Sequence, residues 1–273
     1  MNANAAASAS RDAPEVVLEA RGITRYYGSL AALQDVDLHV SRGEVVGLVG
    51  DNGAGKSTLL KILCGALRPT SGTILVDGEE ANFHSPRDSR ARGIEVVYQD
   101  LALATELSVT ENVFLGRERR RMGPIGRLRV LDWPSMAKEA GTVLDSLGIK
   151  IDDVGARCGL LSGGQRQAVA VARAIMWGSK VLLLDEPTAA LAVMEQQKIA
   201  SLIMEVKKQN VGVVLVSHNL RQVHDLSDRV VVLLHGHRVA NLRPTDVSVE
   251  DLVRWITGVA LETGMPASTG ASG

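Results

Sequence analysis

Residues 50–58 contain the residue types that a phosphate-binding loop requires. The stretch reads Gly-Asp-Asn-Gly-Ala-Gly-Lys-Ser-Thr and matches the pattern G-x-x-x-x-G-K-[ST]. Glycines let backbone N–H groups approach phosphate oxygens without a clash from Cβ atoms, the lysine reaches the β- and γ-phosphates, and the serine hydroxyl can ligate Mg²⁺. We therefore expect ATP and Mg²⁺ as cofactors. The predicted loop contacts are Gly50, Asp51, Asn52, Gly53, Ala54, Gly55, Lys56, Ser57 and Thr58.

Two carboxylates follow a short apolar run, because Leu182–Leu184 leads directly into Asp185 and Glu186. Paired negative charge is costly to bury unless a cation lies nearby, so Asp185 is expected to bind Mg²⁺, directly or through water. Glu186 is suited to orient and deprotonate the water that attacks the γ-phosphate. Taken alone, the pair could be a solvated strand end, and the phosphate loop favours the catalytic interpretation.

The five residues Leu-Ser-Gly-Gly-Gln at 161–165 carry a second signal for anion binding. Ser162 followed three residues later by Gln165 forms a capping box that opens a helix. Gly163 and Gly164 leave N–H groups exposed at the positive end of that helix, where an anion binds well. The two interpretations are compatible, and we expect both a helix start and a second phosphate site.

In this order, the three motifs resemble the nucleotide-binding subunit of an ABC transporter, and the resemblance covers about residues 15–260. It implies that residues 162–165 of one copy contact, in trans, the ATP held by residues 50–58 of a second copy. Two copies of the chain would then close head to tail around two nucleotides. The sequence alone indicates a second anion site, and the resemblance implies the dimer.

The resemblance also implies roles for three further residues. Tyr27 matches the aromatic residue that stacks on adenine, with Tyr26 as the alternative. Gln99 matches the glutamine that contacts Mg²⁺ and links the site to a helical insert. His218 matches the histidine that contacts the γ-phosphate and senses hydrolysis. The expected catalytic residues are therefore Glu186, His218 and Gln99, and the expected Mg²⁺ ligands are Ser57, Gln99 and Asp185.

One departure from the family pattern follows the carboxylate pair. The family usually has Ser-Ala-Leu-Asp where this chain has Ala-Ala-Leu-Ala, so Ala192 replaces the aspartate. In the family that carboxylate helps communication between the two nucleotide sites, and its loss puts the coupling of the two hydrolysis events in doubt. Hydrolysis is still expected. A nucleotide-gated module that rarely hydrolyses ATP is the alternative.

Strands and helices alternate around these motifs. Apolar runs, turn residues and helical spacing predict strands at 44–49, 73–76, 94–98, 181–184, 211–216, 229–234 and 238–241, and helices at 56–67, 134–147 and 165–177. This order predicts an α/β fold with a parallel sheet. The resemblance implies a P-loop NTPase with a RecA-like core, an antiparallel β subdomain and a helical signature subdomain at about 100–164. In this family the Leu-Ser-Gly-Gly-Gln motif, here at 161–165, is called the signature. Disordered tails are expected at 1–13 and 261–273, which leaves 14–260 as the ATP-binding domain.

Composition narrows the class of protein. Apolar residues make up 45% of the chain, and 30 basic residues against 31 acidic ones give a net charge of −1, so no global field attracts nucleic acid. No run of about 18 apolar residues occurs, so any pore belongs to another polypeptide. We expect a peripheral protein on the cytoplasmic face of the inner membrane, with membrane permease subunits as partners. Cys64 and Cys158 lack metal-ligand spacing and are expected to be reduced thiols.

Residues 100–118 resemble the ATP-binding subunits of importers for monosaccharides such as ribose, xylose or fructose. This implies import of a small solute, with a periplasmic solute-binding protein in the same system. Those importers usually carry two cassettes in one chain, so a homodimer is expected here. The alternative is a soluble ABC ATPase that acts on nucleic acid or ribosomes, which the absence of sustained heptads between loop and signature disfavours.

A basic run, Arg117–Arg121, lies in the helical insert together with Arg127 and Arg129. A solvated loop is the favoured interpretation, since runs of like charge are usually exposed. Contact with the permease or with acidic lipid headgroups is the alternative.

Overall fold

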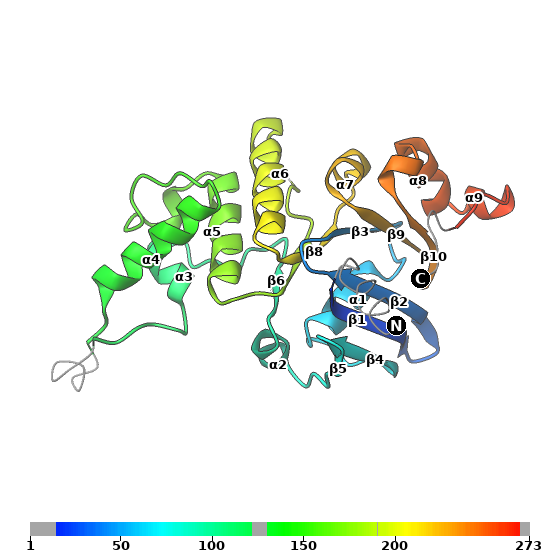
Figure 1. Cartoon of the computed structure of the whole chain (residues 1–273), viewed down its shortest axis with the longest axis horizontal. Helices are drawn as coiled ribbons and strands as arrows, with labels where there is room; N and C mark the ends of the chain where they lie inside the picture. The colour runs from blue at the N-terminus through cyan, green and yellow to red at the C-terminus, as the bar shows by residue number, and fades with distance from the viewer. Residues whose placement is uncertain (1–14, 122–129, 190, 268–273) are drawn as a thin grey trace, which may run out of the picture.

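A six-stranded sheet forms the centre of the computed structural model, which describes residues 15–121, 130–189 and 191–267 (Figure 1). Five strands are parallel and one edge strand is antiparallel. In sheet order they are β10 (His237–Leu242), β9 (Arg229–Leu234), β3 (Val45–Gly50), β8 (Gly212–Val216), β7 (Val181–Asp185) and β6 (Ile94–Val97). The sequence predicts each of them to within one residue at either end. β3, β7 and β8 are long apolar runs because helices or strands cover both faces of the sheet.

A second, antiparallel sheet of four strands is the β subdomain that the resemblance implies. Its order is β2 (Leu30–Ser41), β1 (Val16–Tyr27), β4 (Ser71–Val76) and β5 (Glu79–Glu80). Sequence patterns identify only β4. The pairing of β1 with β2 contains several register shifts, and each bulge interrupts the alternation of inward and outward side chains on which strand prediction depends.

The helix α1 (Lys56–Leu63) lies between the two sheets. Its buried Leu59, Leu60 and Ile62 belong to one apolar cluster with side chains of both sheets. The predicted helix to residue 67 is wrong in its end. Gly65 adopts a left-handed conformation, with φ of 71°, and a Cβ atom there would lie 2.6 Å from the carbonyl oxygen of Ser85. The chain therefore leaves the helix at this glycine and turns toward β4.

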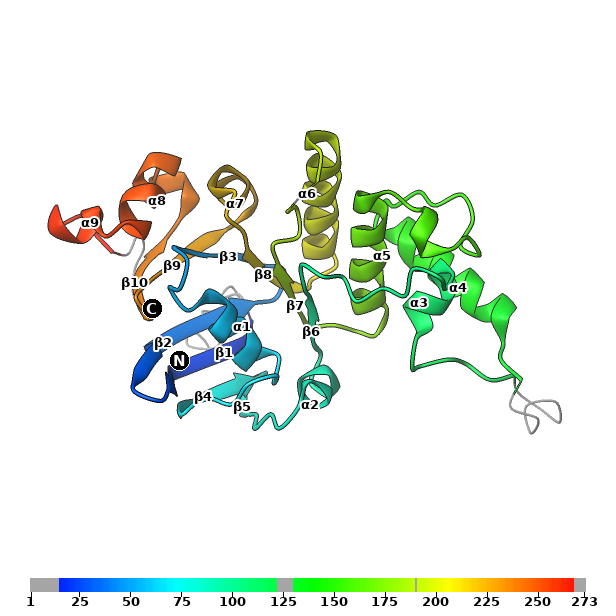
Figure 2. The same cartoon turned by 180° about the vertical axis from the view of Figure 1, so that it is seen from behind.

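A helical layer extends from one edge of the six-stranded sheet (Figures 1 and 2). It consists of α3 (Val109–Phe114), α4 (Trp133–Ser146) and α5 (Gly163–Met176). These helices pack around Phe114, Met136 and Leu144, which are buried in a second apolar cluster. Next to α5 lies α6 (Val193–Lys208), and the short α2 (Pro86–Ala91) precedes β6. No helix in the described ranges is long and apolar enough to cross a bilayer.

Three helices cover the opposite end of the sheet: α7 (Leu220–Leu226), α8 (Val249–Ile256) and α9 (Val259–Glu262). Residues 261–267 of the expected tail at 261–273 are described, and they contact the rest of the chain. Met265 packs on the main apolar cluster, and the N–H of Asn241 donates to the carbonyl of Ala267 at 2.9 Å. An apolar anchor and a strand-edge hydrogen bond thus order the chain as far as Ala267. The expected tail at 1–13 and the last six residues lie outside the described residues.

The helix α6 begins without a side-chain cap. Its N-cap residue, Ala192, has extended backbone angles (φ −65°, ψ 155°) but no oxygen to accept a hydrogen bond. Serine, threonine, aspartate and asparagine are preferred at this position because their oxygen satisfies a free N–H of the first turn. The helix is therefore held by its buried face, which contains Ile199, Leu202, Ile203 and Val206.

Replacement of Ala192 by serine is expected to raise the free energy of unfolding by about 1 kcal/mol, since the hydroxyl supplies the missing cap. The measurement is urea unfolding followed by circular dichroism. Ala200→Ser is the matched control, because it adds the same hydroxyl to the interior of α6, where no free N–H awaits it. Equal changes for both variants would contradict the capping explanation.

Candidate functional site

The carboxyl ends of the parallel strands meet at a cleft of about 270 Å³. β3 leads into the glycine loop, β7 ends at Asp185, and β6 and β8 precede Gln99 and His218. Ligands of open α/β sheets bind at this edge. The lining residues are Ala32, Asn52, Gly53, Ala54, Gly55, Lys56, Ser57, Thr58, Gln99, Asp185, Glu186, Val216 and His218. The structure thus brings together most of the predicted loop, both carboxylates, Gln99 and His218.

The loop follows a path that only glycine permits at two points. A Cβ atom on Gly50 would lie 2.3 Å from the carbonyl oxygen of Leu233, and one on Gly55 would lie 2.6 Å from the side chain of Leu33. Gly55 also has a left-handed φ of 105°. These close approaches hold the loop against β9 and β2, and its N–H groups are available to an anion.

The side chain of Lys56 is enclosed by the loop, and the residue as a whole is only 7% exposed. Its ammonium group donates to the carbonyl of Gly50 at 2.7 Å and to that of Asp51 at 2.9 Å. Gly50 and Asp51 therefore serve the site through their backbone and do not line the cleft. Burial lowers the pKa of Lys56, and the charge of Glu186 opposes that shift. An ammonium has three donors, so one remains for a phosphate.

Glu186 has a left-handed backbone, with φ of 52°. Non-glycine residues pay about 1–3 kcal/mol for such a conformation, and they cluster at functional sites. One carboxylate oxygen of Glu186 accepts a hydrogen bond from the backbone N–H of His218 at 3.2 Å. The other lies 3.3 Å from the imidazole Nε2 of His218, but it is buried without a hydrogen bond. Burial raises the pKa of Glu186, and an unpaired buried oxygen of this kind can accept a proton from water.

The metal ligands expected from the sequence share this cleft. Ser57, Gln99 and Asp185 all line it, and burial raises the pKa of Asp185 while the charge of Lys56 lowers it. No cluster of three or more His, Cys, Asp or Glu side chains that could hold a metal occurs among the described residues, in the cleft or elsewhere. The expected donors in the cleft are instead one hydroxyl, one amide and one carboxylate. This donor set fits Mg²⁺, which usually binds one or two protein ligands together with substrate phosphates.

Tyr27 is not among the described residues that line the cleft. It lies at the end of β1, is 47% exposed, and carries the guanidinium of Arg25 at 5.0 Å from its ring centroid. Tyr26 is exposed beside it. The hairpin from β1 to β2 does bring Ala32 into the cleft. Stacking of Tyr27 on adenine therefore stays a prediction.

The signature residues form the start of α5, as the capping box predicts. The N–H of Gln165 donates to the Ser162 hydroxyl at 3.2 Å, and the side-chain carbonyl of Gln165 accepts from the N–H of Ser162 at 3.0 Å. None of Ser162, Gly163, Gly164 and Gln165 lines the cleft of its own subunit. Sequence reasoning missed Glu195, which accepts a hydrogen bond from the N–H of Gly164.

The sequence model of a protein family described as "ABC transporter" matches residues 33–189, which is more than half of the chain. The chain belongs to the ABC transporter family. It is an ATP-binding subunit of that family, here called the cassette, and its fold is that of a P-loop NTPase, as the resemblance implies.

Similar curated proteins are named for sugar import. The cassette is 43% identical to the fructose import ATP-binding protein FrcA of Rhizobium meliloti and 42% identical to the xylose/arabinose import ATP-binding protein XylG of Sulfolobus acidocaldarius, and each match covers 90% of the cassette and 95% of the relative. It is 40% identical to the ribose import ATP-binding protein RbsA of Chelativorans sp., but that match covers 87% of the cassette and 45% of the relative. The cassette thus spans about half the length of the ribose proteins and nearly all of the other two.

Solved structures agree with this assignment. A nucleotide-free ATP-binding cassette from an ABC transporter superimposes with a TM-score of 0.75 at 25% identity, over 92% of this chain and 99% of that one. A dimeric bacterial ABC transporter cassette superimposes with a TM-score of 0.68 at 26% identity, over 83% and 98% of the two chains.

A groove of about 220 Å³ separates the helical layer from β6. On its wall Glu95 pairs with Arg90 and with Arg117, both at 3.3 Å, and burial raises the pKa of Glu95. Arg117 also lies over the ring of Trp177, 4.8 Å from its centroid. Farther along the basic run, Arg119 pairs with Glu139 at 2.7 Å, whereas Arg127 and Arg129 lie outside the described residues. Arg117 and Arg119 of the basic run therefore form ion pairs within the cassette.

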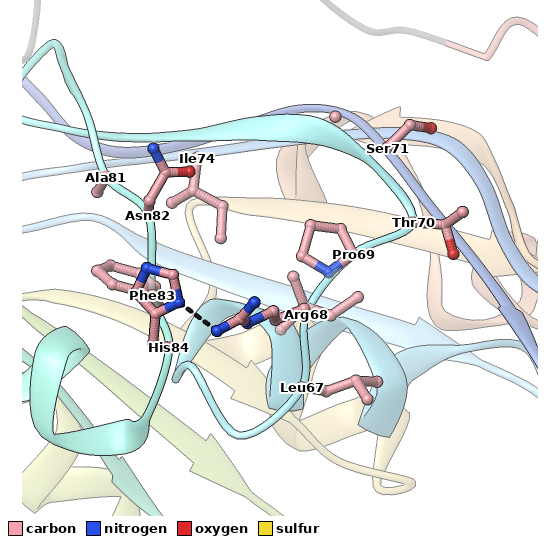
Figure 3. Close-up of a pocket in the computed structure, with 12 residues that line it drawn as sticks. Leu67, Arg68, Pro69, Thr70, Ser71, Ile74, Ala81, Asn82, Phe83 and His84 are labelled. Atoms are coloured by element: carbon pink, nitrogen blue, oxygen red, sulfur yellow. Dashed lines mark hydrogen bonds between the residues drawn. The ribbon is translucent and has the colours of Figure 1, made fainter.

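Another hollow, of about 390 Å³, lies between the end of α1 and β4 (Figure 3). Figure 3 shows the guanidinium of Arg68 directed at the imidazole Nδ1 of His84, which it contacts. Among the residues that the structure describes, no carboxylate lines this hollow. It lacks the groups that phosphoryl transfer requires, and the cleft at the strand ends remains the candidate site.

Replacement of Glu186 by glutamine is expected to change stability with pH. A raised pKa means that folding disfavours the ionised carboxyl, so wild-type stability falls as pH rises above the ordinary glutamate value of 4.5 toward the folded pKa. Glu186→Gln should be more stable than wild type at pH 7, and this advantage should shrink as pH falls through 4.5. Urea unfolding of the nucleotide-free chain at a series of pH values measures it.

Glu111→Gln is a control of opposite sign. Hydrogen bonds from Ser108 lower the pKa of Glu111, so this variant should be less stable than wild type at pH 7, with the difference vanishing at low pH. Parallel pH profiles for the two variants would contradict the assignment of the raised pKa to Glu186.

Proposed function

We propose that the cassette hydrolyses ATP to power import of a small solute, most simply a monosaccharide, through a separate membrane permease. The observation that carries this proposal is the meeting of Lys56, Glu186 and His218 in one cleft at the sheet edge. The names of its relatives, which specify fructose, xylose/arabinose and ribose import, support the sugar class.

Each group in the cleft has a distinct task in hydrolysis. Lys56 and the loop N–H groups bind the phosphates, and Ser57, Gln99 and Asp185 would hold Mg²⁺, which when bound neutralises charge on the β- and γ-phosphates. The free oxygen of Glu186 accepts the proton of the attacking water, and its raised pKa suits that role near neutral pH. His218 holds Glu186 and contacts the γ-phosphate.

A second copy of the cassette supplies the other half of each site. The signature residues lie away from the cleft of their own subunit, while the positive end of α5, where Ser162 is exposed, suits an incoming anion. The dimeric structures of similar cassettes support this arrangement. The pair works at the cytoplasmic face of the inner membrane, with a periplasmic solute-binding protein delivering the sugar.

The permease docks in the groove beside β6. This groove combines an apolar wall, with Leu115 and Trp177, and charged groups on Glu95 and Arg117. Leu115 is 50% exposed and also lines an adjacent, mainly apolar hollow together with Trp133 and Met136. Such a combination of an apolar centre with a charged rim is typical of protein interfaces. The groove also borders the segment after Gln99, so a permease bound there can affect the cleft.

Replacement of Glu186 by glutamine is expected to lower the rate of ATP hydrolysis by a factor of about 10² to 10⁴, because the general base is lost while phosphate contacts remain. Phosphate release and binding of fluorescent ATP measure the two effects. Growth of a strain that lacks the cassette, tested on single sugars, identifies the sugar whose use requires it. The same strain complemented with Glu186→Gln should fail to grow on that sugar. Unchanged hydrolysis would refute the assignment of the base.

Replacement of Leu115 by glutamate is expected to weaken co-purification with the membrane permease at least about tenfold, because a charge is placed in the apolar part of the groove. ATP hydrolysis by the isolated cassette should be unchanged. Leu261→Glu is the matched control, since Leu261 is also 50% exposed but lies on α9 at the other end of the molecule. Equal loss of assembly for both variants would contradict docking in this groove.

A further inference from the structure

The start of α5 has a carboxylate of the same subunit beside it. Glu195, in the first turn of α6, accepts a hydrogen bond from the N–H of Gly164 at 3.3 Å through Oε1. Its side chain lies directly against the two signature glycines. A Cβ atom on Gly163 would be 3.7 Å from Oε2 of Glu195, and one on Gly164 would be 3.2 Å from Cβ of Glu195. The carboxylate therefore lies over the end of the helix where an anion is expected.

Glu195 lies between the starts of α5 and α6 and contacts both. At four other helices of this chain, the acidic or amide side chain at the third helical position turns back to the N–H of a serine N-cap and completes a capping box. These pairs are Ser85 with Asp88, Ser108 with Glu111, Ser162 with Gln165, and Ser248 with Asp251. Glu195 occupies the same third position, but its N-cap, Ala192, has no hydroxyl to complete a box. Its carboxylate accepts hydrogen bonds from the backbone of Ala192 and from Ser162 and Gly164 at the start of α5.

The N–H groups at the start of α5 are already largely used inside the subunit. Those of Ser162 and Gln165 bond within the capping box, and that of Gly164 bonds to Glu195. A phosphate that arrives there meets both an occupied donor and a negative charge. Hydrogen bonds from the Ser162 hydroxyl and from Gly164 lower the pKa of Glu195, so this carboxyl is ionised at neutral pH.

We propose that Glu195 is a positioning residue that occupies the signature end of α5 in the open subunit and must yield to the γ-phosphate held by the second copy. The inference rests on the proposed function, because it requires an ATP-bound partner. It goes beyond that function by naming an internal anion that competes with ATP for the signature. Closure of the dimer then depends on displacement of Glu195.

The test uses Glu186→Gln as the parent protein, since ATP persists in it, and measures ATP-dependent dimerisation by sedimentation. Glu195→Gln added to the parent should tighten the dimer about three- to tenfold, because the amide bonds Gly164 without a charge to repel the phosphate. This gain should shrink as salt is raised, since exposed charges are screened. ADP should give no dimer in either protein.

One further variant separates competition from a structural effect. Glu205→Gln, on the same helix and paired with Lys208 at 2.7 Å, should leave dimerisation unchanged. Urea unfolding of each variant checks that the changes in dimerisation do not follow stability.

The outcomes distinguish a failure of the proposed function from a failure of the role proposed for Glu195. If the parent forms no dimer with ATP, the proposed function fails and this inference fails with it. If the parent dimerises and Glu195→Gln dimerises equally or more weakly, the inference is overturned while the proposed function stands. A gain that is the same at low and high salt would also overturn it, because the effect would not then come from charge.

Discussion

The parallel pairing of β7 with β6 and β8, and of β8 with β3, determines where every reactive group of the cleft lies. Asp185 is paired in register with Val216, and the N–H of Glu186 extends that ladder to the carbonyl of Val216 at 2.9 Å. His218 follows two residues later and returns a hydrogen bond to Glu186. Because backbone hydrogen bonds set this spacing, the two side chains meet without a dedicated side-chain scaffold. β3 brings the glycine loop to the same edge.

This arrangement concentrates charges that are unfavourable without a ligand. Burial removes part of the hydration of three charged groups. It therefore lowers the pKa of Lys56 and raises those of Asp185 and Glu186. The ammonium is satisfied by loop carbonyls, but one oxygen of Glu186 has no hydrogen bond and its backbone is strained. A nucleotide with its cation and water offers partners for these groups. The site therefore gains from binding what the fold alone leaves unsatisfied.

The sequence predicted those parts of the molecule in which one local rule acts alone. Uninterrupted apolar strands, the glycine loop and the serine capping boxes are of this kind, and the structure confirms the strands and the box at Ser162, while residues 52–58 of the loop line the cleft. It could not predict β1 and β2, whose bulges break the alternation, or the order of residues near Met265, which depends on a distant apolar cluster. Glu195 escaped notice because its partner lies 31 residues away in the chain.

A single helix connects the parts of the cassette that must communicate. The start of α5 carries the signature, and its end is followed by Trp177, which lines the groove beside β6. Between them Arg173 donates to the carbonyls of Leu101 and Ala102 at 3.0 Å, in the segment that directly follows Gln99. Burial lowers the pKa of Arg173, and two backbone acceptors hold it firmly. α5 therefore borders the groove, is hydrogen-bonded to the segment that follows Gln99, and begins at the second anion site.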